Sequence, residues 1–365
     1  MRKLSKQEAI DIIYGCAVVG TGGGGNLQSG LKMIEECYNQ GNVVKMAELK
    51  ELGDDDFVAT PYGCGAPRLL ADNTEDPYAG LPRLDYPAPL LAFRTLEEYM
   101  GKKFFAVASS ELGAESTAEA LYIAGMLGIP IMNADAAGRS VPDLQYSTYF
   151  VKKKPIYPMA VATEFGETIL VKEVVDDFRA ESIARAIAVV SDNMVGIADH
   201  PMSGRDYKES VIPEAMTYAM QIGKILRETG AAGGDGYAVA ENIAKENKGK
   251  VMFRGTITEA PWETRDGYNY GEIHLTGREE FKGEKYRIWF KNENIISFRN
   301  GAVDVTSPDL ICMIDKNGIP VNTPNFEKEQ ELTILALPSP DIWTSEEGLD
   351  RKSTRLNSSH LAESR

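Results

Sequence analysis

Three short stretches of the chain combine small residues with charged ones, which is typical of a site where backbone and side-chain groups both reach a ligand. They read "TPYGCGAP" at 60–67, "SSELGAEST" at 109–117 and "NADAAGRSVPDLQ" at 133–145. A carboxylate in such a place could act as a general base or hold a metal ion, and a guanidinium could hold an anionic substituent. The charged candidates are Glu111, Asp135, Arg139 and Asp143.

Each of these candidates also has a purely structural interpretation. Asp135 and Asp143 could cap the turns that follow them, which is the commoner role of a loop aspartate. Arg139 could pair with either carboxylate. Cys64 lies between glycines with no histidine near it in the sequence, so we expect an inert thiol rather than a nucleophile.

Two histidines are candidates for chemistry. We expect His200, in "ADHPMSG", to lie in a loop before a helix, where it could bind substrate, hold a metal ion or only form a hydrogen bond. His274 lies in an alternating segment and is expected to be structural. If a divalent metal ion is the cofactor, its candidate ligands are Asp135, Glu111 and His200.

A run of glycines, Gly22, Gly23, Gly24 and Gly25, stands between two segments that both predict helices. No GK[ST] follows, as a Walker loop requires, and the run follows a helix rather than the strand of a dinucleotide fingerprint. The run could be a flexible turn, or its bare backbone could present N–H groups to a ligand. The helix predicted to begin near Ala114 offers further free N–H groups for an anion.

The pattern of apolar residues predicts the elements that must position these stretches. Strands alternate with helices over residues 1–175, which predicts a three-layer α/β domain with a mostly parallel sheet, whose strand ends would carry the ligand. Residues 176–248 predict helices that pack on this domain. From 249 to 349 apolar residues alternate at period two between turns, which predicts a β-barrel-like domain. The predicted fold class is α/β plus all-β.

Composition limits the class of partner. The formal net charge of -15 disfavours nucleic acid and anionic membranes, and no apolar run is long enough to span a bilayer. The first residues lack the apolar core of a signal peptide. The four cysteines are scattered and form no CxxC pair, so a reducing cytoplasm is the expected compartment.

The last residues, "DRKSTRLNSSHLAESR" at 350–365, differ from everything before them. They are polar, without apolar periodicity, and their first part matches one reading frame of a common sequencing adapter. We therefore expect this segment to be a disordered artefact that replaces the natural ending after Leu349. His360 is left out of the candidate residues for that reason.

Nine motifs, in order along the chain, carry a resemblance to a known family. They are "GTGGGG", "GAP", "ELG", "NADAAGRSVPDLQ", "PMSG", "FRGTI", "KNENI", "SPDLICMID" and "WTSEEGL". Together they resemble the S-methyl thiohydantoin desulfurase family, found with hydantoinase and oxoprolinase genes, over nearly all of residues 5–349. The resemblance implies an α/β domain joined to a β-barrel-like domain and a substrate of the hydantoin type. The chain departs from the family after "ELG", which is usually richer in glycine, and at Asn133, which replaces an acid.

Hydrolytic desulfurization of such a ring needs water to attack C2, a group that activates the water and a donor for the negative intermediate. Asp135 is the first candidate for base or metal ligand and Glu111 the second, while Arg139 could orient a substrate carboxylate. In "KNENI", two roles stay open, bridging strands or binding the ring. The expected substrate-binding residues are Gly22, Gly23, Gly24, Gly25, Gly65, Asp143, His200, Asn292 and Asn294.

The expected function is therefore hydrolysis of a thiohydantoin or related cyclic amide by activated water, without a covalent intermediate. An accessory or regulatory subunit of a hydantoinase-type enzyme is the alternative, and a homo-oligomer is compatible with both. A nucleotide-dependent enzyme is a third hypothesis, weakened because no lysine follows the glycines.

Overall fold

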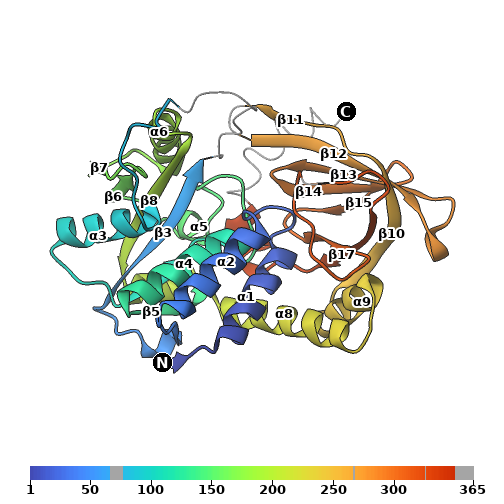
Figure 1. The fold of residues 1–365 in the computed structure, drawn as a ribbon, viewed down its shortest axis with the longest axis horizontal. Helices are drawn as coiled ribbons and strands as arrows, with labels where there is room; N and C mark the ends of the chain where they lie inside the picture. The colour runs from blue at the N-terminus through green and yellow to red at the C-terminus, as the bar shows by residue number, and fades with distance from the viewer. Residues whose placement is uncertain (66–76, 266–267, 325, 350–365) are drawn as a thin grey trace.

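The computed structural model describes residues 1–65, 77–265, 268–324 and 326–349, and contains two β-sheets joined by helices. Sheet A lies at the left and sheet B at the right in Figure 1. The segment expected to be an artefact, 350–365, lies outside the described residues, as do Ala66 and Pro67 of the "GAP" motif. The predicted combination of an α/β part with an all-β part is confirmed in outline.

Sheet A runs in the order β1-β2-β5-β4-β3-β8-β6-β7, with β9 paired to β5. Strands β2, β5, β4 and β3 are parallel to one another. The strands are β1 (Arg2–Lys3), β2 (Lys45–Ala47), β3 (Phe57–Gly65), β4 (Ala106–Ser109), β5 (Pro130–Asp135), β6 (Met159–Ala162), β7 (Thr168–Val171), β8 (Met194–Ser203) and β9 (Ile212–Pro213).

The expectation of a mostly parallel sheet is wrong, because sheet A is mixed. Strands β8, β6 and β7 pair antiparallel beside β3, and β1 and β9 also pair antiparallel. Helical crossovers join the parallel strands, whereas a short turn joins β6 to β7 and so forces them antiparallel. Strand β8 falls inside 176–248, where only helices were predicted.

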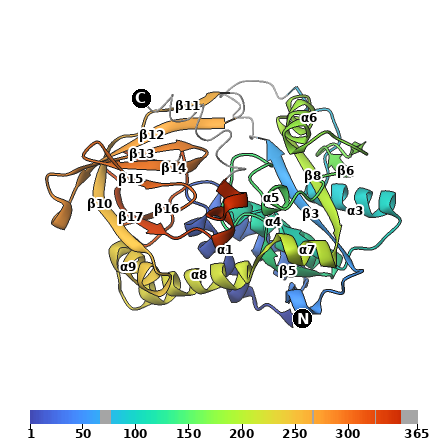
Figure 2. The same ribbon diagram turned by 180° about the vertical axis from the view of Figure 1, so that it is seen from behind.

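The helices cover sheet A and bridge to sheet B. They are α1 (Lys6–Val19), α2 (Leu27–Asn39), α3 (Ala88–Met100), α4 (Ala114–Leu127), α5 (Thr148–Val151), α6 (Asp177–Val189), α7 (Gly204–Ser210), α8 (Ala215–Ala231) and α9 (Gly236–Glu246), with the 3-10 turn η1 (Leu49–Glu51). Helix α4 packs on β3, β4 and β5, and α5 and α7 come forward when the molecule is seen from behind (Figure 2). None of the described helices has the length and hydropathy needed to cross a membrane.

The first helix begins as its sequence predicts. Ser5 and Glu8 form a capping box in which the Glu8 N–H donates to the Ser5 side chain and the Ser5 N–H donates to the Glu8 carboxylate. Helix α1 then packs against α8, and Gly15 and Gly223 allow this close approach because a side chain at either would overlap the backbone of the other helix.

Sheet B is antiparallel throughout the described pairs, in the order β15-β14-β13-β12-β10-β17-β16, with β11 paired to β12. The strands are β10 (Lys250–Glu259), β11 (Trp262–Arg265), β12 (Tyr268–Gly277), β13 (Lys285–Lys291), β14 (Glu293–Arg299), β15 (Ala302–Thr306), β16 (Leu310–Asp315) and β17 (Glu331–Leu337), with the turns η2 (Glu279–Phe281) and η3 (Asp341–Trp343). The sheet curls around its own core, which includes Phe253, Ile288 and Phe290, and forms a half-barrel.

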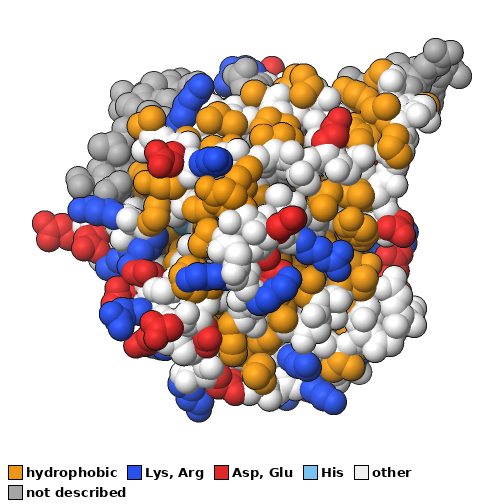
Figure 3. Space-filling model, turned by 90° about the vertical axis from the view of Figure 1, so that its left-hand side faces the viewer, with side chains coloured by type: hydrophobic (Ala, Val, Ile, Leu, Met, Phe, Trp, Pro, Cys, Tyr) orange, Lys and Arg blue, Asp and Glu red, His pale blue; other side chains and the backbone are white. Residues whose placement is uncertain are grey.

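Strand β7 forms the free edge of sheet A at the end of the molecule that carries α3. Figure 3 looks onto this end and shows hydrophobic side chains spread among acidic and basic ones. Several large apolar side chains between residues 81 and 190 are exposed, among them Leu81, Tyr99, Val175 and Val190. The apolar surface is thus broken up by charges rather than gathered into one hollow.

Candidate functional site

A cavity of about 460 Å³ lies where sheet A meets sheet B. Its size is in the range of small-molecule sites. Sheet A contributes the ends of β3 and β8, and the loops after β4 and β5 add two of the stretches singled out in the sequence. Sheet B contributes Asn269 near the start of β12, the turn at Asn292 and the loop residue Thr323. Of the expected site residues, the lining includes Gly22, Gly23, Gly24, Gly25, Gly65, Glu111, Asp143, His200 and Asn292.

The glycine loop forms one wall of the cavity, with Gly22, Gly24 and Gly25 at positive φ. Its carbonyl groups are bound by the protein: Thr323 N–H donates to Gly22, Glu115 N–H to Gly24, and the Asn322 amide to Gly23 and Gly25.

The N–H groups of the loop are used differently. Among the hydrogen bonds of the described residues, only the Gly23 N–H within the run has an acceptor, the Gly20 carbonyl, while those of Gly22, Gly24 and Gly25 have none. The loop lines the cavity, and backbone N–H groups without an acceptor in the described protein can bind an anion. The first turn of α4, expected to offer free N–H groups, instead donates one of them to this loop.

His200 and Asp199 form a buried dyad on β8. Asp199 Oδ1 lies 2.8 Å from His200 Nδ1, and the Tyr62 hydroxyl donates to Asp199 Oδ2 at 2.5 Å. The carboxylate therefore favours the tautomer with hydrogen on Nδ1. His200 Nε2 is buried and has no hydrogen-bond partner among the described residues. In the neutral ring this tautomer leaves Nε2 without a hydrogen, so Nε2 can accept a proton.

A β-bulge explains how adjacent residues reach the same cavity. In a regular strand, consecutive side chains point to opposite faces. Here Val58 pairs with Met202 but Thr60 pairs with Asp199, so β8 has one extra residue at this point. His200 takes φ 45°, a costly conformation for a non-glycine residue. The bulge turns the imidazole beside Asp199, so His200 lies in a distorted strand rather than in the expected loop.

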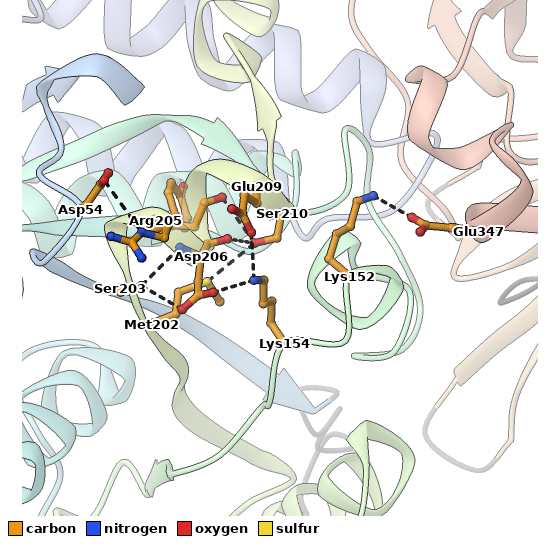
Figure 4. Close-up of polar contacts among 11 residues, drawn as sticks. Asp54, Lys152, Lys154, Met202, Ser203, Arg205, Asp206, Glu209, Ser210 and Glu347 are labelled. Atoms are coloured by element: carbon orange, nitrogen blue, oxygen red, sulfur yellow. Dashed lines mark hydrogen bonds and ion pairs between the residues drawn. The ribbon is translucent and has the colours of Figure 1, made fainter.

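Neighbouring segments fix the bulged strand. The His200 N–H donates to the Ile156 carbonyl. Just before Ile156, the Lys154 ammonium lies 2.6 Å from Asp206 on α7, whose N-cap is Ser203 (Figure 4). Lys152 in the same segment pairs with Glu347, near the end of the described chain (Figure 4). These contacts hold the end of β8 and the segment that supports His200 in one arrangement.

Burial and charge act in opposite directions on His200. Burial lowers the pKa of this imidazole, whereas the Asp199 charge and hydrogen bond raise it, and the net pKa lies above the ordinary histidine value. Burial and the same carboxylate raise the pKa of Tyr62. The Tyr62 hydroxyl thus stays protonated and donates to Asp199, which leaves Asp199 as the charged partner of the histidine.

Two carboxyl groups face the cavity next to the glycine loop. Glu111, in the loop that joins β4 to α4, accepts a hydrogen bond from Val141 N–H at 2.8 Å. Glu293 comes from sheet B, is 3 % exposed, and its Oε2 has no partner among the described residues. Burial raises the pKa of both groups, and the charge of Glu111 adds to the rise for Glu293. The sequence analysis passed over Glu293 and singled out the asparagines on either side.

The "KNENI" motif is the tip of the β13–β14 hairpin, and it docks on the glycine loop. Asn292 takes φ 55° at the turn, a conformation that asparagine tolerates well. Its Oδ1 accepts from Asn269 N–H, and the Asn294 N–H donates to the Thr21 carbonyl, each at 2.8 Å. The Asn294 amide donates to the Ile311 carbonyl, so this residue bridges strands and does not line the cavity.

Charged side chains from both sheets meet at another wall of the cavity. Lys291 Nζ lies 3.0 Å from Asp143 Oδ2, and the Tyr268 hydroxyl donates to Asp143 Oδ1. Arg185 on α6 stacks over the Tyr268 ring and uses its Nε to bind Glu181 at 2.5 Å. Arg185 lines the cavity, and the sequence analysis missed it because a helix-surface Glu–Arg pair four residues apart is an ordinary solvent-facing pattern.

Asp135, the first candidate for the base, lies behind the cavity wall. It has no exposed surface, and its two oxygens accept hydrogen bonds from the N–H groups of Ala137 and Gly138. Burial raises the pKa of Asp135 to about 7 despite these bonds. The residue caps the turn that follows it, which is the structural alternative weighed from the sequence.

Arg139 also lies behind the wall, where it joins the two halves of the molecule. Its Nη2 donates to Thr21 Oγ1 at 2.6 Å and to the Asn294 carbonyl at 3.1 Å, and its Nε donates to the Ser140 carbonyl. Only 3 % of the residue is exposed, and it does not line the cavity. It is therefore not in position to orient a substrate carboxylate.

Neither a thiolate nor a metal centre is built into the cavity as described. Burial raises the pKa of Cys64 to about 12, so this lining thiol stays protonated, as expected for an inert cysteine. Within the described residues, no group of three or more His, Cys, Asp or Glu side chains is arranged to hold a metal ion. Asp135, Glu111 and His200, the candidate ligands, do not form such a group.

Comparison with known proteins gives the family. The profile of the S-Me-THD-like N-terminal domain matches residues 7–173, and that of the S-Me-THD-like C-terminal domain matches residues 175–354. The chain belongs to the S-Me-THD-like family, as the motifs suggested. The second match continues past Leu349 into the segment expected to be an artefact. No curated protein matches the chain.

A crystal structure of another protein shares the fold. It is the crystal structure of a protein from Chromobacterium violaceum, with a TM-score of 0.78 and 20% sequence identity, covering 98% of this chain and 97% of that one. At this identity the likeness extends to the fold alone. Both halves of the molecule and the junction that holds the cavity therefore belong to a fold already seen in a crystal.

Proposed function

We propose that this member of the S-Me-THD-like family hydrolyses a thiohydantoin or related cyclic amide in the cavity between the two sheets. The observation that carries the proposal is the His200–Asp199 dyad, whose Nε2 has no hydrogen-bond partner among the described residues. It lies in the same cavity as the free N–H groups of the glycine loop. A base and a set of backbone donors are the two parts that water attack on a flat ring requires.

In the proposed reaction, His200 Nε2 takes a proton from a water molecule as its oxygen attacks C2 of an S-methyl thiohydantoin. The C2–O bond forms and the C2–S bond then breaks. His200 returns the proton to the departing sulfur, and the products are a hydantoin and methanethiol. In this proposal the N–H groups of Gly22, Gly24 and Gly25, which have no acceptor among the described residues, stabilise negative charge on the substrate. His200 thus replaces Asp135 as the proposed base.

The cavity also suggests what a substituent on the ring would meet. Sequence analysis assigned an anionic substituent to Arg139, whose guanidinium is bound by the protein. Arg185 lines the cavity, and among its described hydrogen bonds only the Nε is used, which donates to Glu181. We therefore assign the role of contacting an anionic substituent to Arg185.

The test is release of thiol from a panel of S-methyl thiohydantoins, with and without added divalent metal ions. Substitution of His200→Gln removes the base and should lower kcat/KM by about 100-fold or more, with the folded state checked by circular dichroism. The matched control is His274→Gln, because His274 also lies 2.9 Å from a carboxylate but in a separate groove of sheet B. It should leave the rate unchanged.

Two outcomes would replace the proposal. Loss of activity in Cys64→Ser together with full activity in His200→Gln would indicate a thiolate nucleophile. Tight binding of the ring without turnover under any condition would favour the alternative, an accessory subunit of a hydantoinase-type enzyme.

A further inference from the structure

Glu293 is the one charged side chain that sheet B inserts directly against the glycine loop in the described part of the cavity. A Cβ at Gly23 would overlap Glu293 Oε1, so the carboxyl group occupies the space that a side chain in the loop would fill. The bare backbone at Gly23 is therefore needed for Glu293 as well as for a ligand. This contact brings a titratable group from one half of the molecule to the donors of the other.

The surroundings of Glu293 leave one oxygen free and disfavour its charged form. The residue lines the cavity but is only 3 % exposed, and its Oε2 is buried without a hydrogen-bond partner among the described residues. An unpaired charged carboxylate in such a place is costly, whereas a protonated carboxyl group can donate to a ligand. Burial is the largest cause that raises the pKa of Glu293, the charge of Glu111 adds to the rise, and Arg139 opposes it.

We propose that Glu293 is the general acid of the hydrolysis, and that it protonates the ring nitrogen of the C2=N bond while His200 takes a proton from the attacking water. This proposal rests on the proposed function. The two groups come from different sheets, Glu293 from β14 and His200 from β8, so the complete acid–base pair exists only when both halves of the chain are assembled.

The proton balance closes over one turnover. As the C2–O bond forms, the π electrons of C2=N move to the nitrogen, which takes the proton of Glu293. As the C2–S bond breaks, the His200 imidazolium gives its proton to sulfur and methanethiol leaves. The hydroxyl group on C2 returns its proton to the Glu293 carboxylate as the carbonyl forms. Both residues end in their starting states, and one water molecule has been consumed.

The experiment compares wild-type protein, Glu293→Gln, Glu293→Asp and the control Glu97→Gln, which removes a buried carboxylate of α3 outside the cavity lining. The activity of each is followed as kcat/KM against pH, and folding is checked by thermal melting. Glu293→Gln should lower kcat/KM by about 10²–10⁴-fold and abolish the descending limb of the pH profile. Glu293→Asp retains an acid and should keep that limb. Glu97→Gln should match the wild type.

A second substrate separates proton donation from a structural role. A ring already alkylated on the nitrogen carries the positive charge and needs no proton there, so Glu293→Gln should hydrolyse it within about tenfold of the wild-type rate. Equal losses on both rings, or a descending limb that survives in Glu293→Gln, would overturn the role of Glu293. If Glu293→Gln does not fold, the loss of the descending limb in Glu293→Asp overturns it instead. No turnover by the wild type would refute the proposed function itself.

Discussion

Replacing Asp199 with asparagine tests the dyad more sharply than removing the histidine. The side chain keeps its shape, but its charge is lost and an amide now faces His200 Nδ1. An amide N–H donated to Nδ1 would place the hydrogen of the imidazole on Nε2, the nitrogen that must accept a proton from water. Asp199→Asn should therefore remove most of the general-base contribution, about 10²–10⁴-fold in kcat/KM, or about 2.7–5.4 kcal/mol.

The pH profile should move in a definite direction. The Asp199 charge and hydrogen bond raise the pKa of His200, while burial lowers it. The activity of a neutral base rises with pH through its pKa, so the ascending limb of the wild type should lie above the ordinary value of about 6.5. In Asp199→Asn burial still lowers the pKa of His200 and only the weaker effect of the Asp177 charge opposes it, so the limb should move to lower pH.

The assay is thiol release measured as kcat/KM across the ascending limb for the wild type, Asp199→Asn and the control Glu272→Gln. Glu272 lies 2.9 Å from His274 Nε2, so the control removes a carboxylate from another histidine of the same chain. It should change neither rate nor profile. A residual activity of Asp199→Asn within about threefold of the wild type, with the limb in place, would refute His200 as the base.

Three further predictions concern the groups around the cavity. Asp135→Asn turns an amide toward backbone N–H donors, so it should lower the free energy of unfolding by about 1–3 kcal/mol in denaturant titrations. Its kcat should stay near the wild-type value. A large loss of kcat with normal stability would restore Asp135 as the base. Gly23→Ala should displace Glu293 and destabilise the chain by about 1–3 kcal/mol. The control Gly80→Ala, where a side chain would meet open space, should not change the melting temperature. Equal melting temperatures of the two variants would contradict the close packing of Gly23 against Glu293. Burial raises the pKa of Glu119 and of Asp135 to about 7, so the folded state binds more protons than the unfolded state between their ordinary values and pH 7. Stability should therefore fall as pH rises through this window, and a melting temperature that is higher at about pH 8 than at about pH 5 would contradict this.

Local patterns in the sequence determined the broad architecture. The capping box at Ser5 predicted where α1 begins, and the change from helical period to period two near Lys250 predicted the second sheet. The glycine run was singled out as either a turn or a ligand-binding backbone, because a run of glycines between two predicted helices is visible in the sequence alone. The order of the motifs also indicated the family. These features depend on residues close together in the chain.

The identity of the acid–base groups depended on tertiary structure. Asp199 and His200 are adjacent in sequence, where strand geometry would separate them, and only the bulge opposite β3 turns both toward the cavity. Asp135 and Arg139 have the right chemistry, but long-range packing buries them and backbone groups occupy their polar atoms.

Glu293 shows the same limit most clearly. It stands between two asparagines in a hairpin turn, where a glutamate is ordinarily solvated. Its contact with Gly23 joins residues from opposite ends of the chain, and the docking of the hairpin tip on the glycine loop removes it from water. Sequence spacing carries no record of that contact, because burial, and with it the protonation state of a carboxyl group, is decided by which surfaces the two halves of the chain bring together.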